Sequence, residues 1–568
     1  MKWLKQNINT LIVLAILIVL NVIGSYLFTR FDLTDEKRYS ISKPTKDFLE
    51  NLDDVVTVRV YLTGNLPSGM TELEKSIEST LNEFKAYAGI NLEYEFVDLN
   101  KLGQKVQEEE GKILMSKGLN PISLTVVESG EQTQKVIFPG AVISYKGRII
   151  SVNLLENKLG YDQYQILNNS IVLIEYKLAN AIQKLQQIHP PVVAFATGHG
   201  EVSQEALGEV IKELQDEQFA VSTIDLSIVF KVDEVVDVLV LVKPRIAFTE
   251  KEKYKIDQYV MKGGKVIFLL DQMAVEMDSL QGTDFFMAYA RDINLDDMLF
   301  QYGARVNDDL VLDLQSAKLE IQTGMTNNQP QMQWFNWPYN NLMFGNENHP
   351  ASRNMAPISG KFTSTIDTIR SANIKKEILL SSSEYSKALL APVRVFVGIV
   401  KEALDPQIFK QKNLPTAVAL SGEFQSIFKN RAFTGAYTAM ADTIEELRFI
   451  EQSEPGAKII LIADGDLLTN HIGKGKKQPV GYAVFGNNNE AMVFDNLPFF
   501  MNCVEYLIDD YNLIETRNKV IKLRQLDITK VKEKRQMIQF SNLISPLLLL
   551  LLFGFVYAFV RRRKFANQ

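Results

Sequence analysis

Apolar residues collect at the two ends of the chain in uncharged runs that are long enough to cross a membrane. Residues 8–28 contain no charged side chain, and neither do residues 543–560, which the basic run 561–564 follows directly. About 20 apolar residues span the hydrocarbon core of a bilayer. We therefore predict a transmembrane helix over each run, in contact with membrane lipid. The alternatives are a cleaved signal peptide for the first run and a buried core helix for the second.

The basic run after the second apolar segment indicates how the chain lies in the membrane. Two spans place both termini on the same side, and Lys and Arg are enriched in cytoplasmic flanks. The basic run 561–564 therefore predicts that both tails, residues 1–7 and 561–568, are cytoplasmic. Residues 29–542 would then form a body on the opposite side of the membrane.

Hydrophobic periodicity after the first run predicts an N-terminal α/β domain over residues 29–188. Apolar positions alternate in residues 53–62 and 91–99, which is typical of strands, whereas residues 71–88 have helical spacing. The predicted order β-α-β-α-β-β resembles a thioredoxin-like fold, and a long helix over 163–187 leads out of it. Because no C-x-x-C motif accompanies the pattern, redox chemistry of the thioredoxin kind is excluded.

Short, largely apolar strands characterise the second predicted domain, residues 189–512. Strands that are buried on both faces read as continuous apolar runs. Their alternation with helical patterns predicts a doubly wound parallel sheet. The predicted strands are residues 192–196, 220–226, 235–242, 265–270 and 457–463.

The regular alternation stops between about residues 274 and 455. The segments there are longer and less regular, which predicts a large α+β insertion in the sheet domain. Beyond the sheet domain, residues 513–542 are rich in charge and predict a helical linker to the second span. The predicted fold class is α/β, with two extracytoplasmic domains flanked by two transmembrane helices.

The composition is that of a folded and mildly acidic protein. Apolar residues make up 46% and charged residues 23%, which excludes wholesale disorder. The net charge of −7 argues against nucleic acid as a partner, because proteins that bind it usually carry a basic surface. A single cysteine forbids an intrachain disulfide. One thiol and four scattered histidines argue against a zinc site, so we expect no metal.

Two glycine-containing loops partly match nucleotide-binding motifs, but neither loop matches its motif in full. Gly198, Gly200 and Ser203 spell G-x-G-x-x-S after a predicted strand, where a dinucleotide fingerprint has a third glycine. Residues 64–69 match the start of a phosphate loop, but Met70 stands where that motif needs lysine. The sequence therefore predicts no nucleotide cofactor and no ATPase activity of the chain's own.

Polar residues and glycines follow several of the apolar strands directly. In an open parallel sheet, ligands bind outside the carboxyl ends of the strands. A histidine with several carboxylates there is suited to ligand binding, although Asp and Gly also make good turns at strand ends. The candidate crevice comprises Gly198, His199, Gly200, Glu201, Asp271, Asp464, Gly465 and Asp466.

An aromatic cluster lies in the predicted insertion, among many Asn and Gln residues. Its members are Trp334, Phe335, Trp337 and Tyr339. Trp and Tyr serve as anchors in protein interfaces, and aromatic rings among amides also suit sugar stacking. A protein interface is the candidate function of this cluster. Burial of the rings in the lobe beneath and glycan binding are the alternatives.

Five segments resemble, in this order, a known family of membrane proteins. They are residues 193–201 (VAFATGHGE), 237–244 (DVLVLVKP), 254–271, 349–357 (HPASRNMAP) and 463–466 (ADGD). Together with the terminal runs and the chain length, they resemble the gliding-motility ABC-transporter accessory proteins of the GldG family of Bacteroidetes. The resemblance covers essentially the whole chain, and it is the order of the motifs that is specific.

The resemblance implies partnership with a multispanning ABC permease and a separate cytoplasmic ATPase. The body would lie in the periplasm, anchored in the inner membrane, and would be substrate-binding-like. Its central domain is similar to a sugar-binding-like domain shared with intraflagellar-transport proteins and to amidotransferase-like sheets. Enzymes with such sheets need a cysteine at a nucleophile elbow, whereas Cys503 lies inside a predicted helix.

The sequence therefore predicts a subunit without catalytic activity, acting in gliding motility through protein–protein or solute binding. Envelope proteins or glycan are its candidate further partners. The alternative is a membrane-tethered receptor for a glycan or another solute. A third reading, a membrane-anchored hydrolase or transferase, is disfavoured by the missing nucleophile.

Overall fold

The computed structural model is mixed α/β and forms two compact units, Met1–Val520 and Ile521–Gln568. All of the predicted first span except Ile16 and Val19, and most of the linker before the second span, lie outside the residues that the structure describes. Described are Ile16, Val19 and residues 40–128, 131–156, 162–187, 189–280, 285–326, 329–371, 373–401, 404–429, 431, 449–470, 472–473, 476–509, 511–518 and 534–565.

The N-terminal part, residues 40–187, is built around a four-stranded sheet in the order β2-β1-β5-β6. Strands β1 and β2 are parallel, and β5 runs antiparallel to β1 and β6. Strands β3 and β4 form a separate hairpin. The elements are α2 (Lys43–Glu50), β1 (Val56–Val60), α3 (Ser68–Ala88), β2 (Leu92–Phe96), α4 (Gln104–Ser116), β3 (Ile122–Glu128), β4 (Glu131–Ile137), β5 (Gly140–Tyr145), β6 (Arg148–Asn153) and α5 (Gln163–Gln186).

In this part, the spacing of the buried residues along each strand and helix matches the period of that element. The alternate residues Val56, Val58 and Val60 of β1 are fully buried, as expected for a strand with one face on the core. Helix α3 buries Leu73 and Ile77 four residues apart, the spacing of one helical face. Helix α5 packs against both α3 and the sheet.

The central part, residues 189–518, contains a parallel sheet in the order β8-β7-β9-β10-β22. Alternate residues of β9 enter two different cores, one that includes helices α7 and α8 and one that includes α6 and α10. All five residues of β9 are buried, which explains their uniformly apolar sequence. The elements are β7 (Val192–Thr197), α6 (Gly208–Asp216), β8 (Ala220–Asp225), β9 (Val238–Val242), α7 (Glu250–Met261), β10 (Lys265–Leu269), α8 (Asp296–Tyr302), β22 (Lys458–Ile462) and α10 (Asn496–Ile508).

The long segment between β10 and β22 extends this sheet with antiparallel strands. Strand β21 pairs with β22, and the path continues through β18, β15, β14, β25 and β26. Two of the shorter two-stranded pairs contribute to a further core, which contains Trp337 and Tyr339. The bounds of the strands in the main path are β14 (Ser316–Thr326), β15 (Gln329–Gly345), β18 (Ile374–Ser381), β21 (Pro415–Gly422), β25 (Tyr482–Phe485) and β26 (Glu490–Val493).

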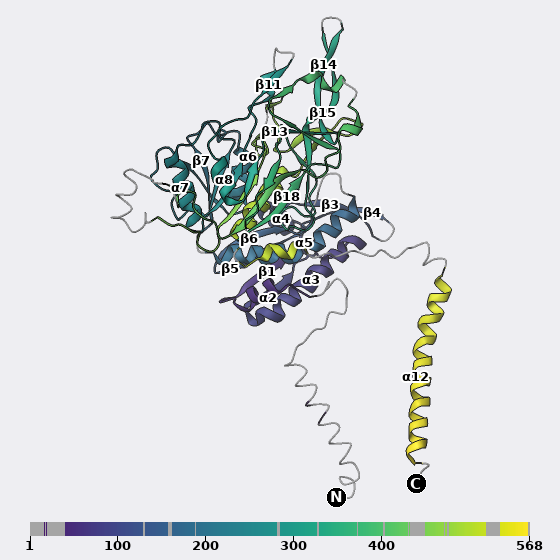
Figure 1. The fold of residues 1–568 in the computed structure, drawn as a ribbon. Helices are drawn as coiled ribbons and strands as arrows, with labels where there is room; N and C mark the ends of the chain where they lie inside the picture. Colours follow the sequence, from purple (N-terminus) through teal and green to yellow (C-terminus); the bar gives the residue numbers. More distant parts are fainter. Residues whose placement is uncertain are drawn as a thin grey trace. The chain divides into compact units, whose positions relative to one another are not determined.

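The chain begins and ends its folded body at neighbouring positions. The rings of Phe48 in α2 and Tyr511, just before the 3₁₀ helix η7 (Leu513–Asn518), meet edge to face with centroids 5.3 Å apart. Glu175 of α5 accepts hydrogen bonds from the Ser42 amide at 2.7 Å and the Thr45 hydroxyl at 2.8 Å. The described segments 42–48 and 511–518 of the body therefore lie near α5, at the end opposite the β14–β15 hairpin (Figure 1).

The second unit is described as one helix, α12 (Arg535–Phe565). Its segment Gln539–Arg563 is the one helix, among the residues described, that is long and apolar enough to cross a membrane, and none of its most apolar stretch is buried. The helix extends further in both directions than the predicted span 543–560. The predicted linker begins with the 3₁₀ turn η7, and its last residues belong to α12.

Candidate functional site

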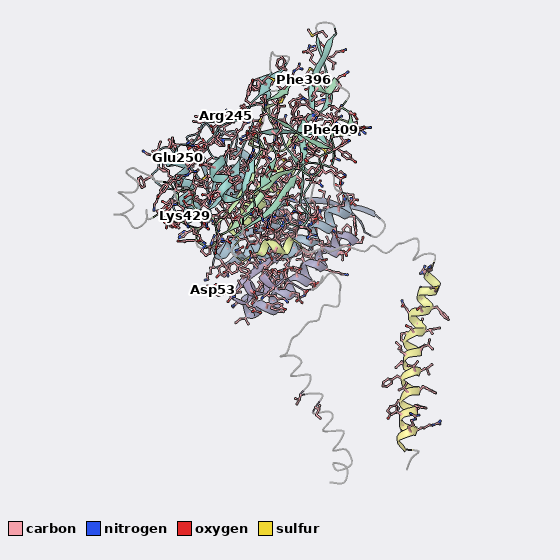
Figure 2. The ribbon with its side chains drawn as sticks, in the orientation of Figure 1. Asp53, Arg245, Glu250, Phe396, Phe409 and Lys429 are labelled. Carbon is pink, nitrogen blue, oxygen red and sulfur yellow. The ribbon has the colours of Figure 1, made fainter. Side chains whose placement is uncertain are left out.

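The carboxyl ends of β7, β9, β10 and β22 share one edge of the parallel sheet, and the predicted crevice residues lie there. They form two adjoining groups, one around Lys243 and one around His199. The backbone amide of Arg245 donates to the His199 carbonyl at 2.8 Å and so joins the groups. Figure 2 shows Arg245 and Glu250 near α7, far from Asp53 in the N-terminal part.

Lys243, the first residue after β9, holds the first group together. Its ammonium lies 3.0 Å from Asp271 Oδ2 and 2.6 Å from Asp466 Oδ1. The backbone of Lys243 has a φ of 53°, which is uncommon for a residue other than glycine. This strained turn directs the side chain back over the strand ends, where only 4% of it is exposed.

Backbone amides donate hydrogen bonds to Asp271 and to Asp464, the third buried carboxylate of this group. Asp271 Oδ1 accepts from the Gly465 amide at 2.6 Å, and Asp464 Oδ1 accepts from the Asp466 amide at 2.8 Å. Asp464 Oδ2 accepts from the Lys361 amide at 2.7 Å and the Thr363 hydroxyl at 3.0 Å. Asp464 therefore holds the long inserted segment against the end of β22.

Burial shifts the proton affinities of this group. Burial, with the charges of Asp271 and Asp466, raises the pKa of Asp464 to about 8. Burial and Asp466 raise the pKa of Asp271 to about 6, against the opposing effect of Lys243. Burial lowers the pKa of Lys361 to about 8, although Asp464 and Asp466 oppose it. Asp464 and Lys361 therefore both have pKa values closer to neutral pH than their ordinary values.

Gly465 is required by the close packing in this group. A side chain there would place its Cβ 2.8 Å from Lys243 Cβ and 2.9 Å from Asp271 Oδ1. The glycine thus lets the β22 loop approach the Lys243–Asp271 pair. Gly198, with a φ of 109°, has a similar role after β7, because a Cβ there would lie 2.6 Å from Asp225 Oδ1.

His199 centres the second group. Its ring stacks on Phe248 with 3.8 Å between centroids, and its Nε2 lies 3.1 Å from Glu252 Oε2. Glu201 accepts a hydrogen bond from the His199 amide at 2.7 Å, and its other oxygen lies 3.6 Å from Nδ1. Burial lowers the pKa of His199, but Glu201 and Glu252 outweigh it and the net pKa is raised.

The structure thus brings together all eight predicted crevice residues, yet it buries most of their polar groups against one another. His199, Asp271 and Asp464 are each at most 6% exposed. Within the described parts of the chain, no group of three or more His, Cys, Asp or Glu side chains is arranged to hold a metal ion. Chemically, this is a buried network of ion pairs and hydrogen bonds that fixes the strand ends.

Sequence reasoning missed Lys243, Lys361, Glu252 and Phe248. The sequence could have revealed Lys243, because this residue directly follows an apolar strand. Its charge is also opposite to that of the acidic residues after the neighbouring strands. The other three come from a helix, a loop and the inserted segment, and no local pattern links them to the sheet edge.

The aromatic cluster divides between the core and the base of a hairpin. Trp337 and Tyr339 are fully buried and pack with Phe362 in the inserted segment. Trp334 and Phe335 are half-buried in β15. Burial of the rings, one of the alternatives, therefore holds for Trp337 and Tyr339.

A cleft of about 520 Å³ lies elsewhere, between the N-terminal and central parts. Strand β6 and helix α5 line one side, and α6 and α10 line the other. Its charged lining includes the ion pair of Lys177 with Glu156, two glutamates of α6 (Glu209 and Glu213), and Glu217 at the C-terminal cap of that helix. Burial and the charge of Glu217 raise the pKa of Glu213.

Comparison with known proteins finds distant relatives. A protein of Borreliella burgdorferi, described as uncharacterized, is 18% identical over 432 residues, which are 75% of this chain and 78% of the relative. The mmIFT52 N-terminal domain aligns over 56% of this chain and 97% of its own length, at 13% identity and a TM-score of 0.31. The exo-β-1,4-mannosidase Op5Man5 from Opitutaceae bacterium strain TAV5 aligns over 53% of this chain and 35% of its own, at 10% identity and a TM-score of 0.21.

Two stretches match known families. Residues 35–144 match a domain family of unknown function, DUF7088. Residues 190–503, more than half of the chain, match the family described as an ABC-type uncharacterized transport system. This match agrees with the ABC-transporter accessory role that the sequence motifs imply. The protein belongs to this family of ABC-type transport auxiliary proteins.

Proposed function

We propose that the protein is a membrane-anchored accessory subunit, without catalytic activity, of an ABC-type transport complex of the gliding-motility type. Its partners are a multispanning permease and a separate cytoplasmic ATPase. The single observation that carries the proposal is the family match over residues 190–503. The unburied apolar helix Gln539–Arg563 supports anchoring beside a membrane-embedded partner.

The finer architecture belongs to the same proposal. The N-terminal part would be a thioredoxin-like domain and the central part a doubly wound domain, both in the periplasm, with spans at 8–28 and 543–560. The parallel strands with cores on both faces are compatible with the second assignment. In the proposal, the sheet edge around Lys243 and His199 contacts a ligand or a partner.

The burial of Cys503, the candidate nucleophile, supports a role without catalysis. Cys503 is fully buried inside α10, and burial raises the pKa of its thiol. A buried thiol with a raised pKa is a poor nucleophile, because the thiolate is the reactive form. The carboxylates of the candidate site are already occupied by Lys243 and backbone amides.

Affinity purification tests the proposed complex. The full chain carrying a C-terminal tag is extracted in a mild detergent, and every co-purifying membrane protein is identified. We expect one multispanning permease and one ATPase at a fixed ratio to the tagged chain. Recovery of neither, from membranes that contain the chain, would contradict the proposal.

Membrane fractionation tests the anchors. A variant that ends after residue 518 is the comparison for the full chain. If residues 8–28 remain as an anchor, the variant stays in the membrane fraction. If they are cleaved as a signal peptide, it becomes a released protein. Release of the full chain itself under mild washing would contradict membrane anchoring.

Solute binding is a second candidate function, and the cleft of about 520 Å³ favours it. Ligand pockets typically measure about 300–1,000 Å³ and often lie between domains. A ligand present at 100 times its Kd stabilises the folded state by about 2.7 kcal/mol. Sugars and amines are therefore screened by thermal shift, with Glu213→Gln as the cleft variant and Glu490→Gln as its surface control. A shift that both variants retain equally would place binding outside the cleft.

A further inference from the structure

The cleft between the N-terminal and central parts carries an excess of negative charge. Six carboxylates line it, namely Glu156, Glu209, Glu213, Glu217, Asp495 and Glu505. Three cations accompany them, Lys177, Lys184 and Arg517, so the lining has three more negative than positive side chains. Arg517 donates a hydrogen bond to Asn502 and lies over the ring of Tyr176, 5.2 Å from its centroid. A cleft lined mainly by one sign of charge attracts ions of the opposite sign.

The two lysines of the lining are already paired with carboxylates. Lys177 forms an ion pair with Glu156. Lys184 is shared, because its ammonium lies 2.6 Å from Glu217 and 3.2 Å from Glu505. The two lysines therefore leave one of these three negative charges uncompensated, and neither ammonium is free to pair with the other carboxylates of the cleft.

The glutamates of the central wall form a row on helix α6 and its C-terminal cap. Glu209, Glu213 and Glu217 follow one another at a spacing of four residues, about 6 Å apart along the helix axis. Lys212 of the same helix is exposed and pairs with Asp216 at 2.7 Å. Like charges at this spacing destabilise a helix, and negative charge near a helix C-terminus is unfavourable as well. The row therefore destabilises α6 unless a counter-charge binds beside it.

Glu213, in the middle of the row, lacks a partner. Glu209 accepts hydrogen bonds from neutral donors, the Asn470 side chain at 2.6 Å and the Val480 amide at 2.8 Å. Glu213 makes no hydrogen bond or ion pair with the residues that the structure describes, although it is half-buried in the cleft wall. Burial, followed by the charge of Glu217, raises the pKa of Glu213. A cation beside this carboxylate would favour its charged form.

The lining also contains many apolar side chains. On the side of the central part they include Phe494, Leu497, Pro498 and Met501. Small-molecule pockets combine such apolar surface with a few polar groups that fix the orientation of the ligand, and they measure about 300–1,000 Å³. The cleft, at about 520 Å³, therefore suits a small molecule that carries separated positive charges on an apolar chain.

We propose that the cleft binds a linear aliphatic diamine or polyamine. Its ammonium groups lie along the row Glu209, Glu213 and Glu217, and its methylene groups contact the apolar side chains of the lining. This inference rests on solute binding as a function of the protein, and it names the class of solute. A spacer of four methylene groups places two ammonium groups about as far apart as successive glutamates of the row. A neutral sugar would leave the whole row uncompensated.

Calorimetric titration of the full chain in detergent tests the ligand class. The probes are spermidine and 1,4-diaminobutane, and 1-aminobutane and 1,4-butanediol are analogues of similar length with one charge and no charge. Magnesium chloride at equal ionic strength measures attraction by charge alone. We expect spermidine to bind most tightly, and 1,4-diaminobutane to bind at least about tenfold more tightly than 1-aminobutane, because hydrogen bonds between charged groups contribute most to binding. The diol should not bind.

Glu213→Gln tests the place of binding. This side chain holds no other described residue, so the variant should fold and melt at or slightly above the temperature of wild type. Its affinity for spermidine should fall at least about tenfold, because it loses a charged hydrogen-bond acceptor. Glu490→Gln removes the same charge from exposed β26, outside the cleft, and should keep the wild-type affinity.

The outcomes separate the amine from solute binding in general. Wild-type affinity for spermidine in Glu213→Gln, equal losses in both variants, or equal affinity for magnesium would each overturn the proposal. A thermal shift with a sugar that Glu213→Gln abolishes, without binding of any amine, would overturn the amine class and leave solute binding in place. No response to any solute would contradict both, whereas the accessory role in a transport complex is decided by co-purification.

Discussion

Lys184 of α5 and Glu505 of α10 form an ion pair across the contact between the N-terminal and central parts, with 3.2 Å between Nζ and Oε1. Only 9% and 13% of the two side chains are exposed. Glu505 also accepts hydrogen bonds from Tyr176 and from the Asn180 amide. Burial opposes ionisation of Glu505, but Lys184 and Tyr176 outweigh it and lower its pKa. A buried charge therefore contributes to the contact between the two parts.

Lys184→Met should strongly destabilise the contact between the two parts, because it leaves Glu505 buried without its cation. Removing one partner of a buried pair costs about 3–5 kcal/mol, whereas replacing both is often nearly neutral. We expect a loss at the low end of that range in urea unfolding, partly recovered in Lys184→Met/Glu505→Gln. Lys212→Met, in an exposed pair with Asp216, is the control. Equal effects of the two single variants would contradict a structural role for the buried pair.

Lys243→Met tests whether the network at the sheet edge is structural. The variant leaves Asp271 and Asp466 close together without their shared cation, so we expect a loss of about 3 kcal/mol at pH 8. The loss should be smaller at pH 5, because protonation of the carboxylates relieves the repulsion. Urea unfolding at both pH values measures it. A loss that is independent of pH would mean that packing of the Lys243 stem, rather than its charge, matters.

Asp464→Asn should change how stability depends on pH. The folded-state pKa of Asp464 is raised to about 8 from 3.8. Between these values the unfolded chain has released the proton that the folded chain retains, so wild-type stability falls as the pH rises. The variant lacks this titration, and its stability relative to wild type should increase from pH 4 to pH 8, by on the order of 3 kcal/mol. Unfolding free energies at several pH values, with Asp216→Asn as the surface control, check the slope. A constant difference would show that Asp464 is ionised throughout.

His349 should make stability depend on pH in the opposite direction from Asp464, at acidic pH. It is 2% exposed and its Nδ1 accepts from the Ala351 amide at 3.2 Å. Burial lowers its pKa to about 4 from 6.5, against the effect of Glu377. The unfolded chain therefore binds the proton first, and stability falls as the pH drops from 6.5 to 4, by at most about 3 kcal/mol.

His349→Gln should remove this loss while keeping an acceptor at the same place. Its stability should therefore vary less than that of wild type over the same interval, as measured by unfolding at pH 4, 5 and 6.5. His189, which lies between the N-terminal and central parts, provides the matched control through His189→Gln. If the free energy of unfolding of His349→Gln falls between pH 6.5 and pH 4 as steeply as that of wild type, other groups cause the loss and the prediction is wrong.

Local patterns were enough to predict much of the architecture. The alternation in residues 53–62 contains β1, and the largely apolar runs coincide with β7, β9, β10 and β22. Side-chain period and burial are set by neighbouring residues, so a single sequence reveals them. The candidate crevice was found for the same reason, since each of its residues directly follows an apolar strand.

The sequence by itself therefore determined the apolar ends, the strand–helix alternation of the central part and the gathering of His199, Asp271 and Asp464 at one sheet edge. Only the tertiary structure decided that the inserted segment continues the sheet, that Trp337 and Tyr339 are buried, and that Lys243 neutralises the acids. These features depend on contacts between residues tens to hundreds of positions apart. Such contacts produce no periodic pattern in the sequence. They are decided by which surfaces of the helices and strands pack together once these elements have formed.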